Sequence, residues 1–446
     1  MIPVQPSLNI LIITSEYPPE IVGGLGTHVY ELAEGLGRLG CEVTVLAPSQ
    51  FARAMVAESN VAVHFFNRTS TTPGAFSSGK MQWFIDLNKN CVLYASQLLK
   101  KQIQRPDIIH CHDWQGFPAA HQLGRLFKIP VIGTVHLLQN PAAKWWGENP
   151  LPEIAKQERT LCRGADALIT VSHSMRELIN ATHQVDVERI HVVYNGMDTN
   201  SFTDFGMTVE ERDSLHRTYA SPEERIIFFA GRLASQKGIQ ALLESASTVL
   251  DQWPTARYLI AGTPDVSPLG WDAERITQEA KKLFSGVFNK WERLKFLGKV
   301  AREQLPALYR IAELAVIPSI YEPFGYAAIE AMATGLPVIA TRVGGLAEII
   351  QDERTGLLIP VEENTDGTHS VDIEKLSAAQ LRLLNDGKLA KLIGQAGREY
   401  VISNFGRDRM AQRTLQVYLR YSLSIRANLR ALESALPVRV HIENSI

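Results

Sequence analysis

The sequence predicts an α/β protein of two Rossmann-like, doubly wound domains that face a central cleft. Three observations lead to this prediction. Short apolar, β-branched runs alternate with amphipathic segments of helix length along most of the 446 residues. The alternation restarts after a turn-rich stretch, NGMDTNSFTDFG, at residues 195–206. The composition, 45% hydrophobic and 21% charged, is that of a globular protein. The length of 446 residues is enough for two or three domains.

Residues 1–200 carry the first series of strands and predict an N-terminal domain. Each strand candidate is short and apolar, which is typical of buried parallel strands. The candidates are Leu8–Thr14, Glu42–Ala47, Val61–Phe66, Asp107–His112, Val131–Val135, Ala167–Val171 and Ile190–Val193. Helical patterns lie between them, as at residues 27–39, 87–104 and 115–127.

Residues 201–405 repeat this pattern and predict a C-terminal domain. Its strand candidates are Ile226–Ala230, Tyr258–Ala261, Leu294–Leu297, Leu314–Pro318 and Val338–Thr341. A long helical segment follows at about Arg407–Ala435. We therefore expect a third part, residues 406–446, made of one helix and a tail.

The charge balance excludes several classes of protein. The chain has 45 Lys and Arg against 47 Asp and Glu, and neither half carries a basic excess, so we expect no nucleic-acid partner. The cysteines, Cys41, Cys91, Cys111 and Cys162, are scattered singly, which favours a reducing compartment. The sequence shows no cleavable signal and no apolar stretch of about 18 residues, so we expect a cytoplasmic protein without a transmembrane segment.

Loops after the strands are the places for chemistry, because ligands of open α/β sheets bind beyond the carboxyl ends of strands. After the first strand, Gly23, Gly24 and Gly26 precede a helix that starts near Thr27. Such glycines let backbone N–H groups approach an anion. The dinucleotide fingerprint is excluded because Val29 stands where its third glycine belongs. A tight turn without a ligand is the alternative.

The fourth strand ends in HCHDW, where His110 and His112 raise the question of a metal site. A metal-dependent hydrolase needs further ligands at other strand ends of one barrel, and His136 is a candidate. Two separate domains do not form such a barrel, so we expect no bound metal. Asp113 either caps the next helix or binds a sugar hydroxyl.

His136 ends the apolar run IPVIGTVH on the side of the expected cleft. This position favours a functional role over that of a hydrogen-bonded core histidine. The following loop carries Trp145 and Trp146. Their rings either stack on sugars or pack in the core.

Charged residues follow two strands of the second domain. Arg232 and Lys237 stand in GRLASQKG, and this pair of cations suits a diphosphate, with solvated surface charge as the alternative. Glu322 lies in a turn before a helix that starts near Phe324, and Glu330 lies about two turns along it. The amides at this helix start favour an anion, and the two carboxylates suit sugar hydroxyls. An exposed Glu330 without a ligand is the alternative.

Together these motifs resemble those of retaining glycosyltransferases of the GT-B fold. Glu322 to Gly325 with Glu330 is similar to their Glu-x7-Glu motif, GRLASQKG to their diphosphate loop, and EYPPEIVGGLGTHVYELAEGL to their N-terminal Gly-Gly loop. NGMD and TGLPVIATRVGGLAEII also fit, so the resemblance runs from Ile10 to about Tyr418. HCHDWQ resembles glycogen and starch synthases, although sucrose synthases, trehalose synthases and cell-surface glycosyltransferases share most of these motifs. LLQNPAAKWWGENPLPE and NFGRDRM depart from the pattern and leave the acceptor open.

The resemblance implies a role for each candidate residue. His136, Arg232, Lys237 and Glu322 would form the catalytic group, with His136 over the anomeric centre. Arg232 and Lys237 would hold the donor diphosphate and Glu322 the hexose, while Glu330 would bind the ribose. The other donor contacts would come from Gly24, Val300, Phe324, Gly325 and Tyr326. Asp113, Trp145 and Trp146 would lie on the acceptor side, in the N-terminal domain. The last helix would cross back to that domain.

The implied reaction moves a hexose, with glucose expected, from an ADP- or UDP-sugar to a carbohydrate acceptor such as a glucan. No cofactor and no metal are expected, because the sequence has no DxD motif and the two cations can stabilise the leaving diphosphate. Front-face attack by the acceptor hydroxyl would retain the anomeric configuration. A nucleotide-sugar epimerase of the same fold, a transferase for a small-molecule or cell-surface acceptor, and a non-catalytic sugar-binding protein are the alternatives. The donor base and the oligomeric state stay open.

Overall fold

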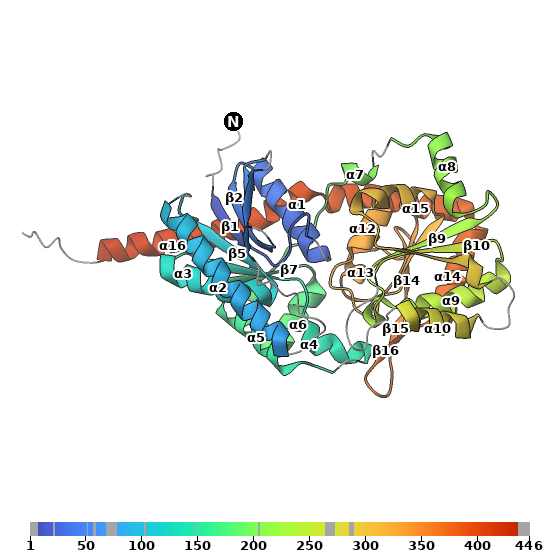
Figure 1. Ribbon diagram of the computed structural model, residues 1–446, viewed down its shortest axis with the longest axis horizontal. Coiled ribbons are helices and arrows are strands. Elements are labelled where there is room, and N and C mark those ends of the chain that lie inside the picture. Colours follow the sequence, from blue (N-terminus) through green and yellow to red (C-terminus); the bar gives the residue numbers. More distant parts are fainter. Residues whose placement is uncertain are drawn as a thin grey trace, which may run out of the picture.

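The computed structural model describes residues 8–20, 23–50, 52–56, 59–67, 78–101, 104–147, 149–203, 206–263, 273–284 and 290–435. Two separate parallel sheets, each with helices packed around it, lie side by side (Figure 1). The predicted α/β class with two doubly wound sheets is confirmed. The boundary at residue 200 stays a prediction, and the tail at 436–446 lies outside the described residues.

The N-terminal sheet has eight strands in the order β3-β4-β2-β1-β5-β6-β7-β8. Its strands are β1 (Asn9–Ile13), β2 (Glu42–Ser49), β3 (Arg53–Val56), β4 (Val61–Asn67), β5 (Ile108–His112), β6 (Val131–Val135), β7 (Ala167–Thr170) and β8 (Ile190–Val192). All pairs are parallel except β3 with β4. Every residue of the central strands β5 and β6 is buried, as expected for strands covered on both faces.

Helices surround this sheet and connect its strands, except for β2, β3 and β4, which follow each other with no helix among the described residues between them. They are α1 (Gly24–Arg38), α2 (Ser78–Lys101), α3 (Asp113–Phe127), α4 (Gln139–Ala142), η1 (Ala143–Trp146), α5 (Pro152–Gly164), α6 (His173–His183) and η2 (Val187–Arg189). The order of the central strands sets the geometry of the site. Because β1, β5 and β6 are neighbours, the loops after these three strands lie next to each other.

The C-terminal sheet has six parallel strands in the order β11-β10-β9-β12-β13-β14. They are β9 (Arg225–Ala230), β10 (Ala256–Ala261), β11 (Leu294–Gly298), β12 (Leu314–Ile317), β13 (Val338–Thr341) and β14 (Leu357–Ile359), followed by an antiparallel hairpin of β15 (Val361–Glu363) and β16 (His369–Val371). The helices are α7 (Asn200–Thr203), α8 (Val209–Tyr219), η3 (Ser235–Lys237), α9 (Ile239–Gln252), α10 (Ala273–Leu283), η4 (Trp291–Arg293), η5 (Arg302–Gln304), α11 (Leu305–Ile311), α12 (Tyr326–Ala333), α13 (Gly344–Ile349), α14 (Ile373–Asn385) and α15 (Gly387–Asn404).

The final helix, α16 (Arg407–Ala435), leaves the second domain and packs on the first (Figure 1). Gly35 of α1 permits this close contact, because a Cβ there would lie only 2.7 Å from the Cβ of Ala411. The Tyr418 hydroxyl lies 2.6 Å from Nδ1 of His110 on β5. Both domains are therefore tied together by the chain after residue 405 as well as by the linker near residue 200.

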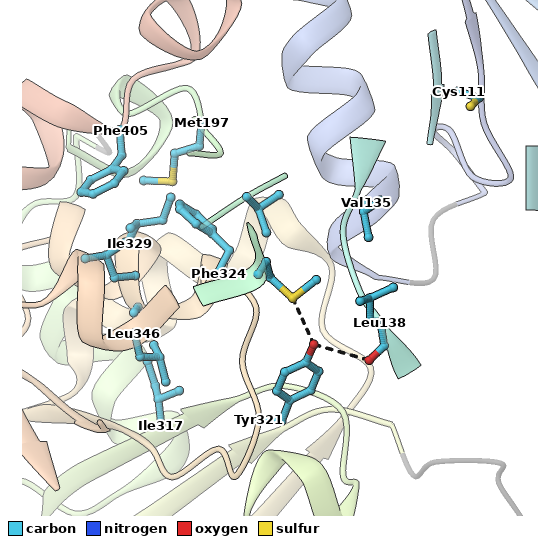
Figure 2. Packing of buried hydrophobic residues seen from close by; sticks show 14 of the residues in the cluster. Cys111, Val135, Leu138, Met197, Ile317, Tyr321, Phe324, Ile329, Leu346 and Phe405 are labelled. Atoms are coloured by element: carbon cyan, nitrogen blue, oxygen red, sulfur yellow. Dashed lines mark hydrogen bonds between the residues drawn. The ribbon is translucent and has the colours of Figure 1, made fainter. Parts of the chain in front are cut away.

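One hydrophobic cluster continues from the first domain into the second (Figure 2). Leu138, after β6, and Phe324, before α12, belong to it. The Tyr321 hydroxyl, after β12, lies 3.5 Å from the carbonyl oxygen of Leu138 and 3.1 Å from the sulfur of Met175. These contacts join segments that follow strands of different sheets, so the carboxyl ends of the two sheets face each other. Among the described residues, none of the helices has the length and apolar character needed to cross a membrane.

Candidate functional site

Lys237 and Glu322 meet at the carboxyl end of the C-terminal sheet. Lys237 closes η3 after β9, and Glu322 lies in the turn after the neighbouring strand β12. The Lys237 ammonium donates to Oε2 of Glu322 over 2.6 Å, with the side chains 21% and 14% exposed. Arg232, in the same loop as Lys237, is exposed. The structure thus brings together Lys237, a predicted diphosphate contact, and Glu322, a predicted hexose contact, as expected for adjacent strand ends.

Glycines fix the backbone on both sides of this pair. Gly238, with φ +69°, lies so close to β12 that a Cβ would be 1.8 Å from the carbonyl oxygen of Pro318. Gly344, with φ +44°, meets the carbonyl of Glu322 in the same way, at 2.3 Å. A side chain at either position would push the two loops apart. Gly238 therefore sets the distance between the Lys237 loop and the end of β12, and Gly344 sets that between the Glu322 turn and the loop before α13.

The helix after Glu322 starts two residues later than predicted. The helix expected from near Phe324 begins at Tyr326, because Gly325 has φ +114°, which is outside the helical region. Phe324 is buried. The Tyr326 ring crosses to the other domain, where a Cβ on Gly24 would lie 3.4 Å from it. Residues 24, 325 and 326, all predicted donor contacts, are thus gathered at one place.

Glu330 is buried within α12, with 6% of its surface exposed, so the alternative of an exposed helix residue is wrong. Oε1 of Glu330 lies 3.4 Å from Nε of Arg302. Burial raises the pKa of Glu330, and the Arg302 charge partly offsets this effect. Glu330 therefore lies where a group with hydroxyls could replace or share its contact with an arginine.

Arg302 also reaches the first domain, where its Nη1 lies 2.9 Å from Oε1 of Glu31 on α1. Glu31 is 1% exposed and binds a second arginine, Arg407 at the start of α16, over 2.5 Å. Its Oε2 also accepts from the backbone N–H of Asp198 over 3.1 Å. Sequence reasoning missed Glu31 and Arg302, since neither follows a strand end directly and their separation of 271 residues leaves no local pattern.

A group of histidines occupies the carboxyl end of the N-terminal sheet. Nδ1 of His112, the last residue of β5, lies 3.0 Å from Nε2 of His136, just after β6. The ring of His28 on α1 approaches both, at 4.5 Å from the ring centre of His136 and 5.3 Å from that of His112. Burial lowers the pKa of His28 to about 4 and that of His136 well below its usual value, so both rings are neutral at neutral pH. The sequence analysis missed His28. Only its position, one turn after the Gly-Gly loop, could have indicated that it lies at the site.

Asp113 holds the backbone of His136 in place. Its Oδ1 accepts the His136 backbone N–H over 2.7 Å, and Asp113 has φ +53°, which is unusual for a residue with a side chain. Burial raises the pKa of Asp113 to about 7, partly offset by the backbone N–H groups of His136 and Leu137. This contact makes Asp113 a support for His136, and its contact with an acceptor stays a prediction.

The remaining candidates lie at the edges of the contact between the domains. The Trp145 ring packs edge-on against Tyr321 and lies 5.1 Å from the ring centre of His369. The side chain of Trp146 lies outside the described part of the chain. Val300 follows β11 and is partly buried. The contacts of Trp145 are aromatic packing contacts between the two domains.

Comparison with protein families gives two matches that together cover most of the chain. The profile described as "Glycosyltransferase Family 4" matches residues 22–201, and the one described as "Glycosyl transferases group 1" matches residues 211–400. Among curated proteins, an alpha-maltose-1-phosphate synthase of Mycolicibacterium smegmatis is 31% identical over 428 residues, covering 93% of this chain and 100% of that protein. A glycogen synthase of Mycobacterium tuberculosis is 28% identical over 449 residues, covering 97% and 100%.

Solved structures show the same two-domain fold at lower identity. Sucrose-phosphate synthase from Thermosynechococcus elongatus superposes with a TM-score of 0.73 at 23% identity, covering 94% of this chain and all of that one. The catalytic domain of starch synthase IV from Arabidopsis thaliana, bound to ADP and acarbose, gives 0.69 at 19% identity, with coverage of 94% and 100%. Anabaena HepE in complex with UDP-glucose gives 0.68 at 18% identity, with coverage of 92% and 99%.

Proposed function

This chain belongs to the glycosyl transferases group 1 family and has the GT-B fold, and we propose a reaction from that premise. The enzyme moves a glucosyl group from a nucleotide diphosphate sugar to a hydroxyl of a glucan, with retention of the anomeric configuration. The family makes it a nucleotide-sugar-dependent hexosyltransferase. The observation that carries the proposal is the Lys237–Glu322 contact beside α12, with Glu330 buried further along that helix. Relatives named glycogen synthase and alpha-maltose-1-phosphate synthase support a glucan or glucosyl acceptor.

The donor lies along the carboxyl end of the C-terminal sheet. Lys237 and Arg232 bind the diphosphate, Glu322 the hexose and Glu330 the ribose hydroxyls. Glu322 lies in the turn before α12, and at a rise of about 1.5 Å per residue Glu330 lies about 6 Å along the helix from Tyr326, which suits a hexose at the turn and a ribose further along. Backbone groups of Phe324 to Tyr326 and of Val300 make the remaining donor contacts.

The chemical step breaks the bond between the anomeric carbon and the diphosphate. Negative charge grows on the leaving oxygen, and Lys237 with Arg232 and the amides before α12 stabilises it there. The acceptor hydroxyl attacks from the same face as the leaving group and passes its proton to a diphosphate oxygen. The neutral His136 imidazole contacts the hexose and is held in place through its backbone by Asp113. Approach of the two domains keeps water from the donor.

The direct test offers the purified chain ADP-, UDP- and GDP-glucose, each with and without a glucan primer, and measures released nucleoside diphosphate. We expect release from one or two donors that depends on the primer, and an α-anomeric product by proton NMR. A Lys237→Ala variant with unchanged folding serves as the inactive control. Sugar epimerisation of the donor alone, or no release from any nucleotide sugar, would contradict the proposal.

A further inference from the structure

His28, His112 and His136 converge from three separate elements, α1, the end of β5 and the residue after β6. One ring nitrogen from each lies within 4.8 Å of the others. Because β1, β5 and β6 are neighbours in the sheet, their loops cannot easily move apart. The cluster is thus a fixed feature of the fold and not a chance meeting of surface side chains.

The hydrogen bonds of these rings are incomplete. Nε2 of His112 is buried without a hydrogen-bond partner among the described residues. The side chain of Asn195 interacts with the His28 ring and raises its pKa, but neither ring nitrogen of His28 has a described partner within hydrogen-bond distance and angle. His110, two positions before His112 on β5, differs, because its two ring nitrogens lie 2.6 Å from the hydroxyls of Tyr418 and Thr134. Buried polar atoms nearly always have a partner, so the orphaned nitrogens of the cluster call for one.

The imidazole nitrogens of the cluster determine which kind of ligand it can bind. Nδ1 of His112 and Nε2 of His136, 3.0 Å apart, share one proton, and a metal ion that displaces this proton would bind both rings. Three imidazole nitrogens with one open position are a common site for Zn²⁺, with nitrogen–metal distances of about 2.0–2.1 Å. Such a site places its nitrogens about 3.3 Å apart, which small ring rotations can reach from the distances here. His136 is the partly exposed member of the cluster, and Asp113 fixes its backbone through the His136 N–H over 2.7 Å.

We infer that His28, His112 and His136 form a binding site for a divalent transition-metal ion, Zn²⁺ being the best match, and that its occupancy stops sugar transfer. The binding claim stands on the geometry of the three rings. The inhibition claim rests on the proposed function. A metal coordinated by the His136 imidazole would prevent the contact of this ring with the hexose. The site is therefore inhibitory, and transfer itself needs no metal.

The test begins with the full chain, treated with EDTA and dialysed. Titration with Co²⁺ should give the visible absorption of a four-coordinate complex at one equivalent, and Zn²⁺ should displace it. His28→Gln and His112→Gln should each weaken binding at least tenfold, whereas His121→Gln, on α3 outside the cluster, should bind as the parent does. Circular dichroism of each variant checks its fold, and the two cluster variants are read separately.

Failure of the site and failure of the proposed function give different results. Absence of a one-equivalent Co²⁺ complex, or equal binding in both folded cluster variants, would overturn the metal site whatever the activity. In the transfer assay, Zn²⁺ should inhibit the parent, EDTA should reverse the inhibition, and His28→Gln should need at least tenfold more Zn²⁺. Tight Zn²⁺ binding with full transfer activity would overturn the inhibition claim and leave the metal site standing.

Discussion

In the proposed mechanism, departure of the nucleotide depends most on Lys237 and Arg232. Lys237→Ala and Arg232→Ala should each lower kcat strongly while the protein stays folded, because each removes a charge-assisted contact to the leaving group. The expected loss is about 2–4 kcal/mol of transition-state stabilisation. Steady-state kinetics with the preferred donor measures it, with Lys388→Ala, exposed at the start of α15, as the control. A near-normal kcat in both variants would show that the diphosphate lies elsewhere.

The proposed mechanism needs no metal for departure of the diphosphate, because Lys237 and Arg232 would stabilise its charge. We expect transfer to survive an excess of EDTA, with the rate equal to or above that before treatment. Kinetics after dialysis against EDTA, with and without added Mg²⁺ or Mn²⁺, provide the measurement. Loss of activity that either ion restores would mean that a metal holds the leaving group.

The sequence pointed to residues in the loops after strands and to Glu330 of α12, but it did not point to the other helical residues near the site. Lys237, Glu322 and His136 follow buried strands, and the sheet itself decides that their loops are neighbours. His28 and Arg302 lie on α1 and η5, where the direction of a side chain depends on how the helical segment packs. No local sequence pattern indicates how these helical segments pack. The histidine cluster and the arginine bridge therefore emerge only in three dimensions.

At the scale of elements, the β9–α9 loop depends on the absence of a side chain at Gly238. Gly238→Ala would put a Cβ 1.8 Å from the carbonyl oxygen of Pro318, in a left-handed conformation that itself costs about 1–2 kcal/mol. The loop must shift, so we expect a lower melting temperature and a loss of kcat as Lys237 leaves Glu322. Gly367→Ala is the matched control, since Gly367 has φ +82° and open space around it. Equal effects of both substitutions on kcat would contradict this account.

Strands were predictable where they are buried and β-branched, and less so where they are short or at an edge. β6 and β13 have the predicted bounds. The exposed edge strand β3 was missed, as were β14 and the hairpin of β15 and β16, each of three residues per strand. Such short segments gain their strand form from pairing with a neighbour and carry little pattern of their own.

For the whole molecule, Glu31 joins the two domains through its buried contacts with Arg302 and Arg407. Glu31→Gln leaves Arg302 with its 3.4 Å contact to Glu330 and Arg407 with its 3.8 Å contact to Asp198. Breaking a buried pair in this way typically costs about 3–5 kcal/mol. We expect the melting temperature to fall by several degrees. Arg342→Gln, which breaks the exposed contact with Asp352, should change it little, because surface pairs contribute about 0–1 kcal/mol. Equal melting temperatures for the parent and Glu31→Gln would show that this bridge does not stabilise the molecule.

The central claim is the direction of the donor across the second domain, with ribose at Glu330 and hexose at Glu322. Calorimetry with the product nucleoside diphosphate, set beside kcat, tests it most directly in two isosteric variants. Glu330→Gln should weaken nucleotide binding about 10–100-fold, because a charge-assisted contact to the ribose contributes about 1.5–3 kcal/mol. Glu322→Gln should keep nucleotide binding, since Lys237 remains available to the diphosphate, and should lower kcat instead. If both variants bind nucleotide as the parent does, or if only Glu322→Gln loses it, the donor lies in a different direction from the one described.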